Sequence, residues 1–159
     1  LLYIQDSDLW RFNYSETKDI ILALRSYPQD FEVWDSLNWT YLEKEGKAIS
    51  RYYYRKLQEQ LSNALPLTIC GVKGKVVNAP KMFASDLGNL LAVETGTFGA
   101  TYFTRGDGMV EFSLRSSKEN GNLDVSSIAK DFGGGGHRNA AGFTLKQVWN
   151  FPVPEETQE

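Results

Sequence analysis

The chain has 159 residues, of which 42% are hydrophobic and 23% are charged, and its formal net charge is −3. This length fits one domain with a helical appendage, and the apolar content excludes disorder over most of the chain. No apolar run approaches the roughly 20 residues of a membrane helix and no signal peptide is visible, so we expect no membrane partner. The charges form no long basic stripe, which argues against a large footprint on duplex nucleic acid but leaves room for a small anionic ligand.

The first 66 residues are predicted to be mostly helical. Residues 1–5 are typical of a strand end, so we expect a fragment of a longer protein. Pro28 should end the first helix and Gly46 should break the second, because proline and glycine disfavour helix interiors. The expected helices run from Ser15 to Arg25, from Asp30 to Gly46, and from Ala48 to Leu65.

Strand and helix patterns alternate after Pro66. The expected strands cover residues 67–72, 75–78, 98–104, 109–114 and 141–145, and the expected helices cover 83–94 and 125–132. This order predicts a mixed β-sheet with flanking helices. The sequence therefore indicates an α/β fold, with a connector and helical linker over 1–66, a small domain over 67–150 and a tail over 151–159.

The single cysteine and the single histidine limit the chemistry of this chain. One cysteine excludes an internal disulfide and a cysteine-based zinc cage, and one histidine excludes a multi-histidine metal site. Apolar neighbours predict that Cys70 is a buried thiol in a strand, which favours a reducing, cytoplasmic location.

A glycine-rich segment follows the last expected helix and is the leading candidate for a site. Four glycines exceed what a helix cap requires, and bare backbone lets a ligand approach and can form an anion-binding nest. The alternative is a flexible turn whose polar side chains point to water. The segment comprises Gly133, Gly134, Gly135, Gly136, His137, Arg138 and Asn139, followed by the small residues Ala140, Ala141 and Gly142.

Arg115 is a second candidate, at the end of an expected strand. Alternation places it on the face opposite Leu114, and the serines at 113, 116 and 117 flank it. A guanidinium in such surroundings suits bidentate capture of a phosphate or carboxylate, although an ordinary exposed arginine is the alternative.

Two further features favour structural interpretations. Asp6 and Asp8 could hold a metal, but we expect them to accept hydrogen bonds from backbone amides in a turn. The many aromatic residues of the first 66, Tyr52 and Trp39 among them, suggest packing against an absent domain.

The chain resembles the C-terminal part of the DHH-family phosphoesterases, which include oligoribonucleases, RecJ-type exonucleases and exopolyphosphatase-like hydrolases. The Gly-His-Arg-Asn-Ala-Ala-Gly-Phe segment is similar to the signature of their DHH-associated substrate-binding domain. Other similar stretches, in order, are Asp6-Ser-Asp-Leu-Trp, Val77-Asn-Ala-Pro, Phe83-Ala-Ser-Asp-Leu-Gly, Val110-Glu-Phe-Ser-Leu-Arg-Ser and Leu123-Asp-Val-Ser-Ser-Ile-Ala.

The resemblance implies a two-domain enzyme whose N-terminal DHH domain is absent here. That domain would bind two Mn²⁺ or Mg²⁺ ions and activate a water, so no catalytic or metal-binding residue is expected in this chain. Arg115, His137 and the amides of Gly133–Gly136 would grip a terminal phosphate or sugar, with Arg138 and Asn139 beside them. The implied partners are short RNA, DNA or a nucleotide phosphate, the absent DHH domain and a second copy in a homodimer.

Alternative functions stay open at this point. A similar glycine-rich domain ends alanyl-tRNA synthetases, so a stand-alone RNA-binding module is one alternative. Hydrolysis of cyclic dinucleotides or of polyphosphate by the parent enzyme is another. Stacking of a base on aromatic side chains would distinguish these two substrates, because polyphosphate has no aromatic face.

Overall fold

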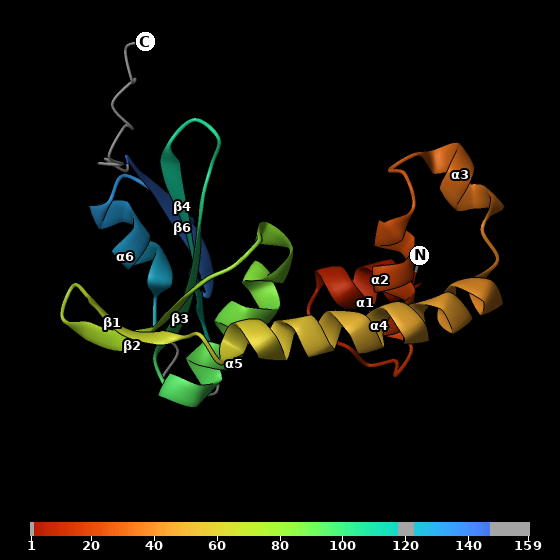
Figure 1. Ribbon diagram of the computed structural model, residues 1–159, viewed down its shortest axis with the longest axis horizontal. Coiled ribbons are helices and arrows are strands. Elements are labelled where there is room, and N and C mark those ends of the chain that lie inside the picture. Colours follow the sequence, from red (N-terminus) through yellow and green to blue (C-terminus); the bar gives the residue numbers. More distant parts are fainter. Residues whose placement is uncertain (1, 118–122, 147–159) are drawn as a thin grey trace, which may run out of the picture. The chain divides into compact units, whose positions relative to one another are not determined.

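The computed structural model describes residues 2–117 and 123–146, and the predicted tail over 151–159 lies outside these ranges (Figure 1). The chain divides into two compact units, residues 1–58 and residues 59–159. The first unit is helical, and the second contains a six-stranded mixed sheet with helices. The expected α/β fold, with helices first and a mixed sheet after them, is confirmed.

The first unit is built on a small apolar cluster. Ala23, Leu24 and Leu42 are buried together, and Ile4 packs against them. Its helices are α1 (Leu2–Asp8), α2 (Thr17–Ser26), α3 (Phe31–Ser36) and α4 (Trp39–Leu61), the last of which ends in the second unit. The predicted strand over 1–5 is wrong, because a five-residue apolar run has no readable period and contact of Ile4 with the cluster favours a helix here.

The predicted helix break at Gly46 is also wrong, since α4 continues through this residue. A Cβ at position 46 would stand 2.2 Å from the backbone oxygen of Asp19. Glycine is therefore required for α2 and α4 to approach closely, and this packing outweighs its low helix propensity. The helix ends at Leu61, not at Leu65 as predicted.

Asp6 organises the loop between α1 and α2. Its buried carboxylate accepts hydrogen bonds from Thr17 Oγ1 at 2.6 Å and from the Asn13 amide at 2.9 Å. Burial alone raises the pKa of Asp6, but these hydrogen bonds outweigh that effect and hold the pKa below its usual value. The prediction that Asp6 binds backbone amides is confirmed. The loop also contains Trp10 and Phe12 at φ of 54° and 50°, a strained conformation for side chains of this size.

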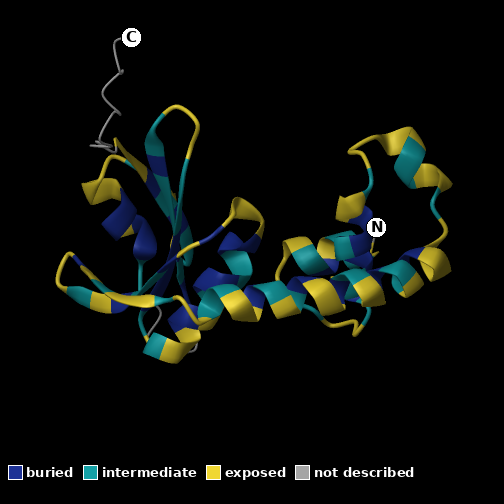
Figure 2. Ribbon diagram, viewed as in Figure 1, coloured by how far each residue is buried: buried dark blue, intermediate teal, exposed yellow. Residues whose placement is uncertain are grey.

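The second unit places helices on both faces of its sheet (Figure 1). The strand order is β1-β2-β3-β4-β6-β5, and only β2 and β3 are parallel. Helix α5 joins those two strands and packs on β3, while Val125, Ile128 and Ala129 of α6 are buried in the core cluster that contains Leu114. Buried residues, dark blue in Figure 2, gather between the sheet and these helices. The elements are β1 (Leu65–Ile69), β2 (Val72–Asn78), a 3-10 turn (Lys81–Phe83), α5 (Ala84–Thr95), β3 (Phe98–Thr104), β4 (Met109–Ser116), α6 (Val125–Asp131), β5 (Gly135–His137) and β6 (Ala140–Lys146).

The first hairpin differs from the prediction by its turn. Cys70 and Gly71 form the turn, so Cys70 is exposed at φ 48° and the predicted buried thiol is wrong. Gly74, which lies between the two expected strands 67–72 and 75–78, is buried inside β2, where a Cβ would stand 2.6 Å from the Phe98 oxygen. The strand expected over 67–72 therefore extends too far, because β1 ends at Ile69.

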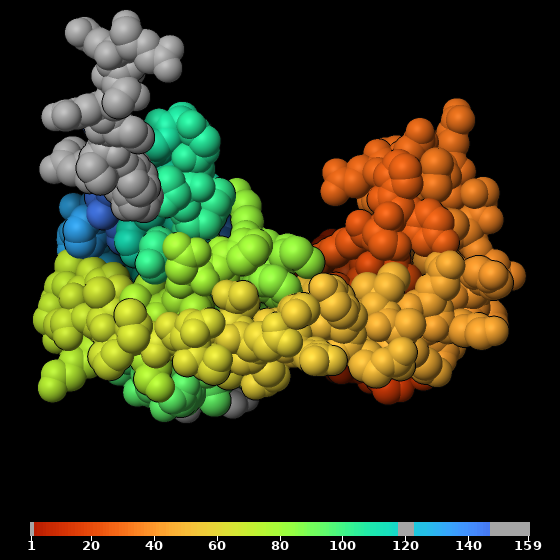
Figure 3. All heavy atoms as spheres, viewed as in Figure 1, coloured from red at the N-terminus to blue at the C-terminus, as the bar shows by residue number. Residues whose placement is uncertain are grey.

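Several local features agree with common sequence signals for helix ends and hairpin turns. Asp30 and Asp124 accept hydrogen bonds from the second amides of α3 and α6, at 2.8 and 2.9 Å. Gly96 ends α5 in the left-handed conformation at φ 70°. The hairpin turn over 105–108, in teal, lies at the surface (Figure 3). These signals worked because each depends on short-range geometry alone.

Candidate functional site

Strand register brings two of the predicted site residues to one face of the sheet. Arg115 of β4 pairs with Ala140 of β6, and Ala140 pairs with His137 of β5. Directly paired residues share a face, so the arginine and histidine stand two strands apart, about 10 Å between Cα atoms. Ala140 between them is small, which leaves space above it.

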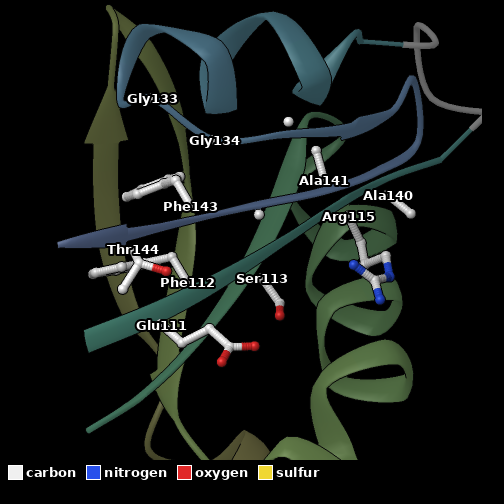
Figure 4. Close-up of a pocket in the computed structure, with 12 residues that line it drawn as sticks. Glu111, Phe112, Ser113, Arg115, Gly133, Gly134, Ala140, Ala141, Phe143 and Thr144 are labelled. Carbon is white, nitrogen blue, oxygen red and sulfur yellow. The ribbon is translucent and has the colours of Figure 1, made fainter. Parts of the chain in front are cut away.

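The next row on this face is also low in bulk. Ser113 pairs with Gly142, and Gly142 pairs with Gly135, so only one hydroxyl rises from this row. Glu111 and Thr144 form the third row, beyond the end of the short β5. Figure 4 shows Arg115, Ser113 and Glu111 leaving β4 on the side away from Phe112 and Phe143.

These rows line a pocket of about 470 Å³. Its wall includes residues of three segments, namely β4, β6 and the glycine loop after α6 (Figure 4). The lining residues are Glu111, Phe112, Ser113, Arg115, Gly133, Gly134, Gly135, Ala140, Ala141, Gly142, Phe143 and Thr144. Of the predicted site residues, Arg115, Gly133, Gly134 and Gly135 line this pocket, whereas Gly136, His137, Arg138 and Asn139 do not.

Arg115 is a half-buried cation without a carboxylate partner in the described ranges. Its Nη1 donates to the Leu114 carbonyl at 2.9 Å, and its Nη2 donates to Ser85 Oγ at 3.1 Å. Burial lowers the pKa of Arg115, although an arginine stays charged at any physiological pH. A guanidinium has five N–H donors, so this one keeps donors for an anion in the pocket.

Helix α5 fixes the stem of this arginine. A Cβ at Gly88 would stand 2.7 Å from Cγ and 3.2 Å from Cβ of Arg115. The glycine thus opens a channel on the helix surface through which the side chain runs. The guanidinium is held at the pocket by packing of its stem and by its bond to Ser85.

The four glycines have different reasons to be glycine. Gly133 and Gly136 have φ of 74° and 142°, which other residues rarely adopt. A Cβ at Gly134 would stand 2.1 Å from the Gly142 oxygen. A Cβ at Gly135 would meet nothing within 4 Å, and its φ is ordinary. Backbone conformation or close packing therefore explains three of these glycines, and Gly135 is left as open pocket wall.

Hydrogen bonds to the end of β4 and to the start of α6 hold the turn between β5 and β6. Asn139 Nδ2 donates to Ser116 Oγ at 2.9 Å, and the Ser116 amide donates to the Asn139 carbonyl. Arg138 accepts a bond from the Val125 amide on its carbonyl, and its Nη1 lies 3.9 Å from Asp124 Oδ2. The sequence suggested that the Ser116 hydroxyl flanks the guanidinium and helps to bind an anion. In the structure Ser116 is buried, and its hydrogen bonds hold this turn. The side chain of His137 is exposed on β5.

Tyr102, Phe103 and Phe143 are aromatic residues that could stack on a base, and Phe103 pairs with Glu111 on the arginine's face of the sheet. Tyr102 stacks on Phe112 at 5.5 Å between ring centroids, and Phe112 stacks on Phe143 at 4.9 Å. Phe103 therefore lies on the face of Arg115, whereas Tyr102, Phe112 and Phe143 lie on the opposite face. Their rings form part of the packed interior on the α6 side of the sheet.

Glu111, Thr144, Ser85 and Gly88 were missed by the sequence reasoning. The alternation that placed Arg115 opposite Leu114 also puts Ser113 and Glu111 on the arginine's face, so this signal was present. Ser85 and Gly88 could not be found in that way, because their approach to Arg115 depends on how α5 lies on the sheet.

Within residues 2–117 and 123–146, no three His, Cys, Asp or Glu side chains gather into a metal site. None of the helices in the same ranges is long and apolar enough to cross a bilayer.

Comparison with known proteins places this geometry in a family. The DHHA1 domain matches residues 73–159, a segment that contains every residue of the pocket wall. The chain belongs to the DHHA1 domain family. It therefore carries the domain associated with DHH phosphoesterases, as the glycine-histidine signature indicated.

Similar proteins are longer than this chain. An uncharacterized protein, R106, of Acanthamoeba polyphaga mimivirus is 32% identical over 163 residues, covering 93% of this chain and 37% of the viral protein. An uncharacterized protein from Helicobacter pylori G27 is 23% identical, with a TM-score of 0.40 over 72% of this chain and 30% of that one. The pGpG-specific phosphodiesterase PggH from Vibrio cholerae is 11% identical, with a TM-score of 0.46 over 65% of this chain and 37% of that one.

Proposed function

We propose that this DHHA1 domain binds the phosphate of a short oligonucleotide or nucleotide and presents it to a phosphodiesterase domain. The observation that carries this proposal is Arg115, a half-buried cation on the pocket wall without a carboxylate partner in the described ranges. A partly buried charge is costly unless an opposite charge joins it, so the pocket favours an anionic ligand. The open pocket wall at Gly135 supports the same proposal.

The donors around the pocket suit a phosphate. The arginine fork can form two parallel bonds to phosphate oxygens, and Ser113 adds a hydroxyl two residues along the strand. His137 shares the face of Arg115 across Ala140, so its imidazole can reach the same ligand. In this proposal the imidazole of His137 donates a hydrogen bond to a phosphate oxygen.

Hydrolysis belongs in this proposal to a separate DHH domain that holds Mn²⁺ or Mg²⁺. Such ions neutralise the phosphate and activate a water, and the DHHA1 domain would supply orientation of the substrate. The protein would act in the cytoplasm on the ends of short nucleic acids. The exposed aromatic residues of the helical unit, such as Trp10 and Tyr52, offer apolar area for contact with that domain.

Calorimetric titration with a 5′-phosphorylated dinucleotide tests the proposal. Arg115→Ala should weaken binding about 10- to 100-fold, the usual range for a charge-assisted hydrogen bond, and Arg115→Lys should restore part of the loss. Arg105→Ala is the matched control, because Arg105 pairs with Asp107 in an exposed turn away from the pocket wall. Binding should not require Mn²⁺.

Two results would contradict the proposal. Equal affinity of the wild type and Arg115→Ala would show that the pocket is not the phosphate site. Absence of dinucleotide binding, together with salt-sensitive binding of long RNA, would favour the RNA-module alternative.

A further inference from the structure

The pocket has two ends of opposite chemistry. Arg115 and Glu111 both line it and lie on one face of β4, four residues apart. At about 3.4 Å per residue their Cα atoms are about 14 Å apart, and Ser113 lies between them. A ligand that lies along the strand therefore meets a cation at one end and a carboxylate at the other.

An ion pair holds the carboxylate of Glu111 in place but does not use all of its hydrogen-bond acceptor positions. Its Oε1 lies 2.9 Å from Lys81 Nζ, and the exposed fractions of the two side chains are 24% and 70%. A carboxylate has about four acceptor positions on its two oxygens, and the lysine occupies one of them. The remaining positions on Glu111 stay available to a ligand in the pocket that it lines.

This carboxylate narrows the class of ligand. An ionised carboxylate only accepts hydrogen bonds, so Glu111 attracts N–H or O–H groups and offers no donor to a second phosphate. A polyphosphate chain bound at Arg115 would place negative charge toward Glu111. A nucleoside monophosphate places its phosphate at the arginine and an uncharged, donor-bearing base at the far end.

We propose that Glu111 determines base specificity and selects guanine, an inference that rests on the phosphate-binding function above. Guanine has two adjacent donors, N1–H and N2–H, which the two oxygens of one carboxylate can accept together. Adenine and cytosine place an acceptor beside their amino donor, and uracil has a single donor between two acceptors. Each of these three bases would leave an acceptor facing the charge of Glu111, which costs binding energy.

Titration of the full chain with nucleoside 5′-monophosphates tests this assignment. Ribose 5-phosphate, GMP, AMP, CMP and UMP are compared on the wild type, Glu111→Gln and the control Glu94→Gln, which alters an exposed carboxylate of α5 paired with Lys75. The wild type and the control should bind GMP at least 10-fold more tightly than the other nucleotides. Glu111→Gln should lose this preference and shift toward AMP, because an amide offers one donor and one acceptor.

Ribose 5-phosphate separates the two levels of the proposal. Its affinity should fall with Arg115→Ala and stay unchanged in Glu111→Gln. Equal affinity of the wild type for all four nucleotides, or a GMP preference that survives Glu111→Gln, overturns the guanine assignment while the phosphate site stands. Absence of binding for every ligand overturns both.

Discussion

Two neighbouring glycines should respond in opposite ways to the same substitution. In Gly135→Ala the new methyl group meets no atom within 4 Å, and the backbone φ is one that alanine adopts. Alanine also restricts the unfolded chain, so this variant should be as stable as the wild type or more stable by about 0.4–1 kcal/mol. In Gly134→Ala the methyl group would stand 2.1 Å from the backbone oxygen of Gly142. Overpacking of this kind costs about 1–3 kcal/mol.

Measurements of the Tm and of dinucleotide affinity together distinguish the two variants. Gly134→Ala should lower the Tm by roughly 4–24 °C, since 1 kcal/mol corresponds to about 4–8 °C in a domain of this size. Gly135→Ala should have a Tm equal to or higher than that of the wild type, but it should bind the 5′-phosphorylated dinucleotide about 10-fold or more weakly, because the methyl group occupies the pocket wall. Unchanged dinucleotide affinity in a stable Gly135→Ala variant would refute the assignment of this wall to the ligand.

Two further predictions concern the helical unit. Gly46→Ala should lower the Tm although alanine favours helices, because its Cβ would stand 2.2 Å from the backbone oxygen of Asp19. The control Lys44→Ala, on the exposed side of α4, should leave the Tm unchanged. A Gly46→Ala variant with a raised Tm would contradict this packing. Asp6→Asn should lower the Tm at neutral pH. Because the pKa of Asp6 is depressed in the folded chain, its contribution is complete above the unfolded pKa of about 3.9 and is lost as pH falls through the folded value. The difference in Tm between wild type and Asp6→Asn should therefore shrink in circular-dichroism melts below about pH 4, and a constant difference would argue against a charged Asp6.

Elements marked by strong local signals were predictable from the sequence. The caps at Asp30, Asp124 and Gly96 depend on a few consecutive residues, and the alternation of β3 and β4 shows which residues face the core. Arg115 and the glycine run were found in the same way. Their side-by-side placement followed only from the register of β4, β6 and β5.

The errors arose where packing outweighed local preference. The run 1–5 has too few residues to show a period, and Gly46 is kept in a helix by the approach of Asp19. Strand β5 consists of two glycines and His137, none of which has strand propensity that could be recognised, and it forms because β6 pairs with it. Glu111 escaped notice because its relevance depends on a pocket wall built from segments distant in sequence.

The packing of the Arg115 stem against Gly88 limits which substitutions this site can accept. Any larger residue at position 88 removes the space that the arginine stem occupies, and loss of the arginine leaves an unfilled channel on α5. Substitutions at the two positions should be tolerated together more readily than apart, so that Gly88→Ala is partly rescued by a shorter side chain at 115. Re-engineering the charge preference of this pocket thus begins on helix α5, at a residue that is not part of the pocket wall.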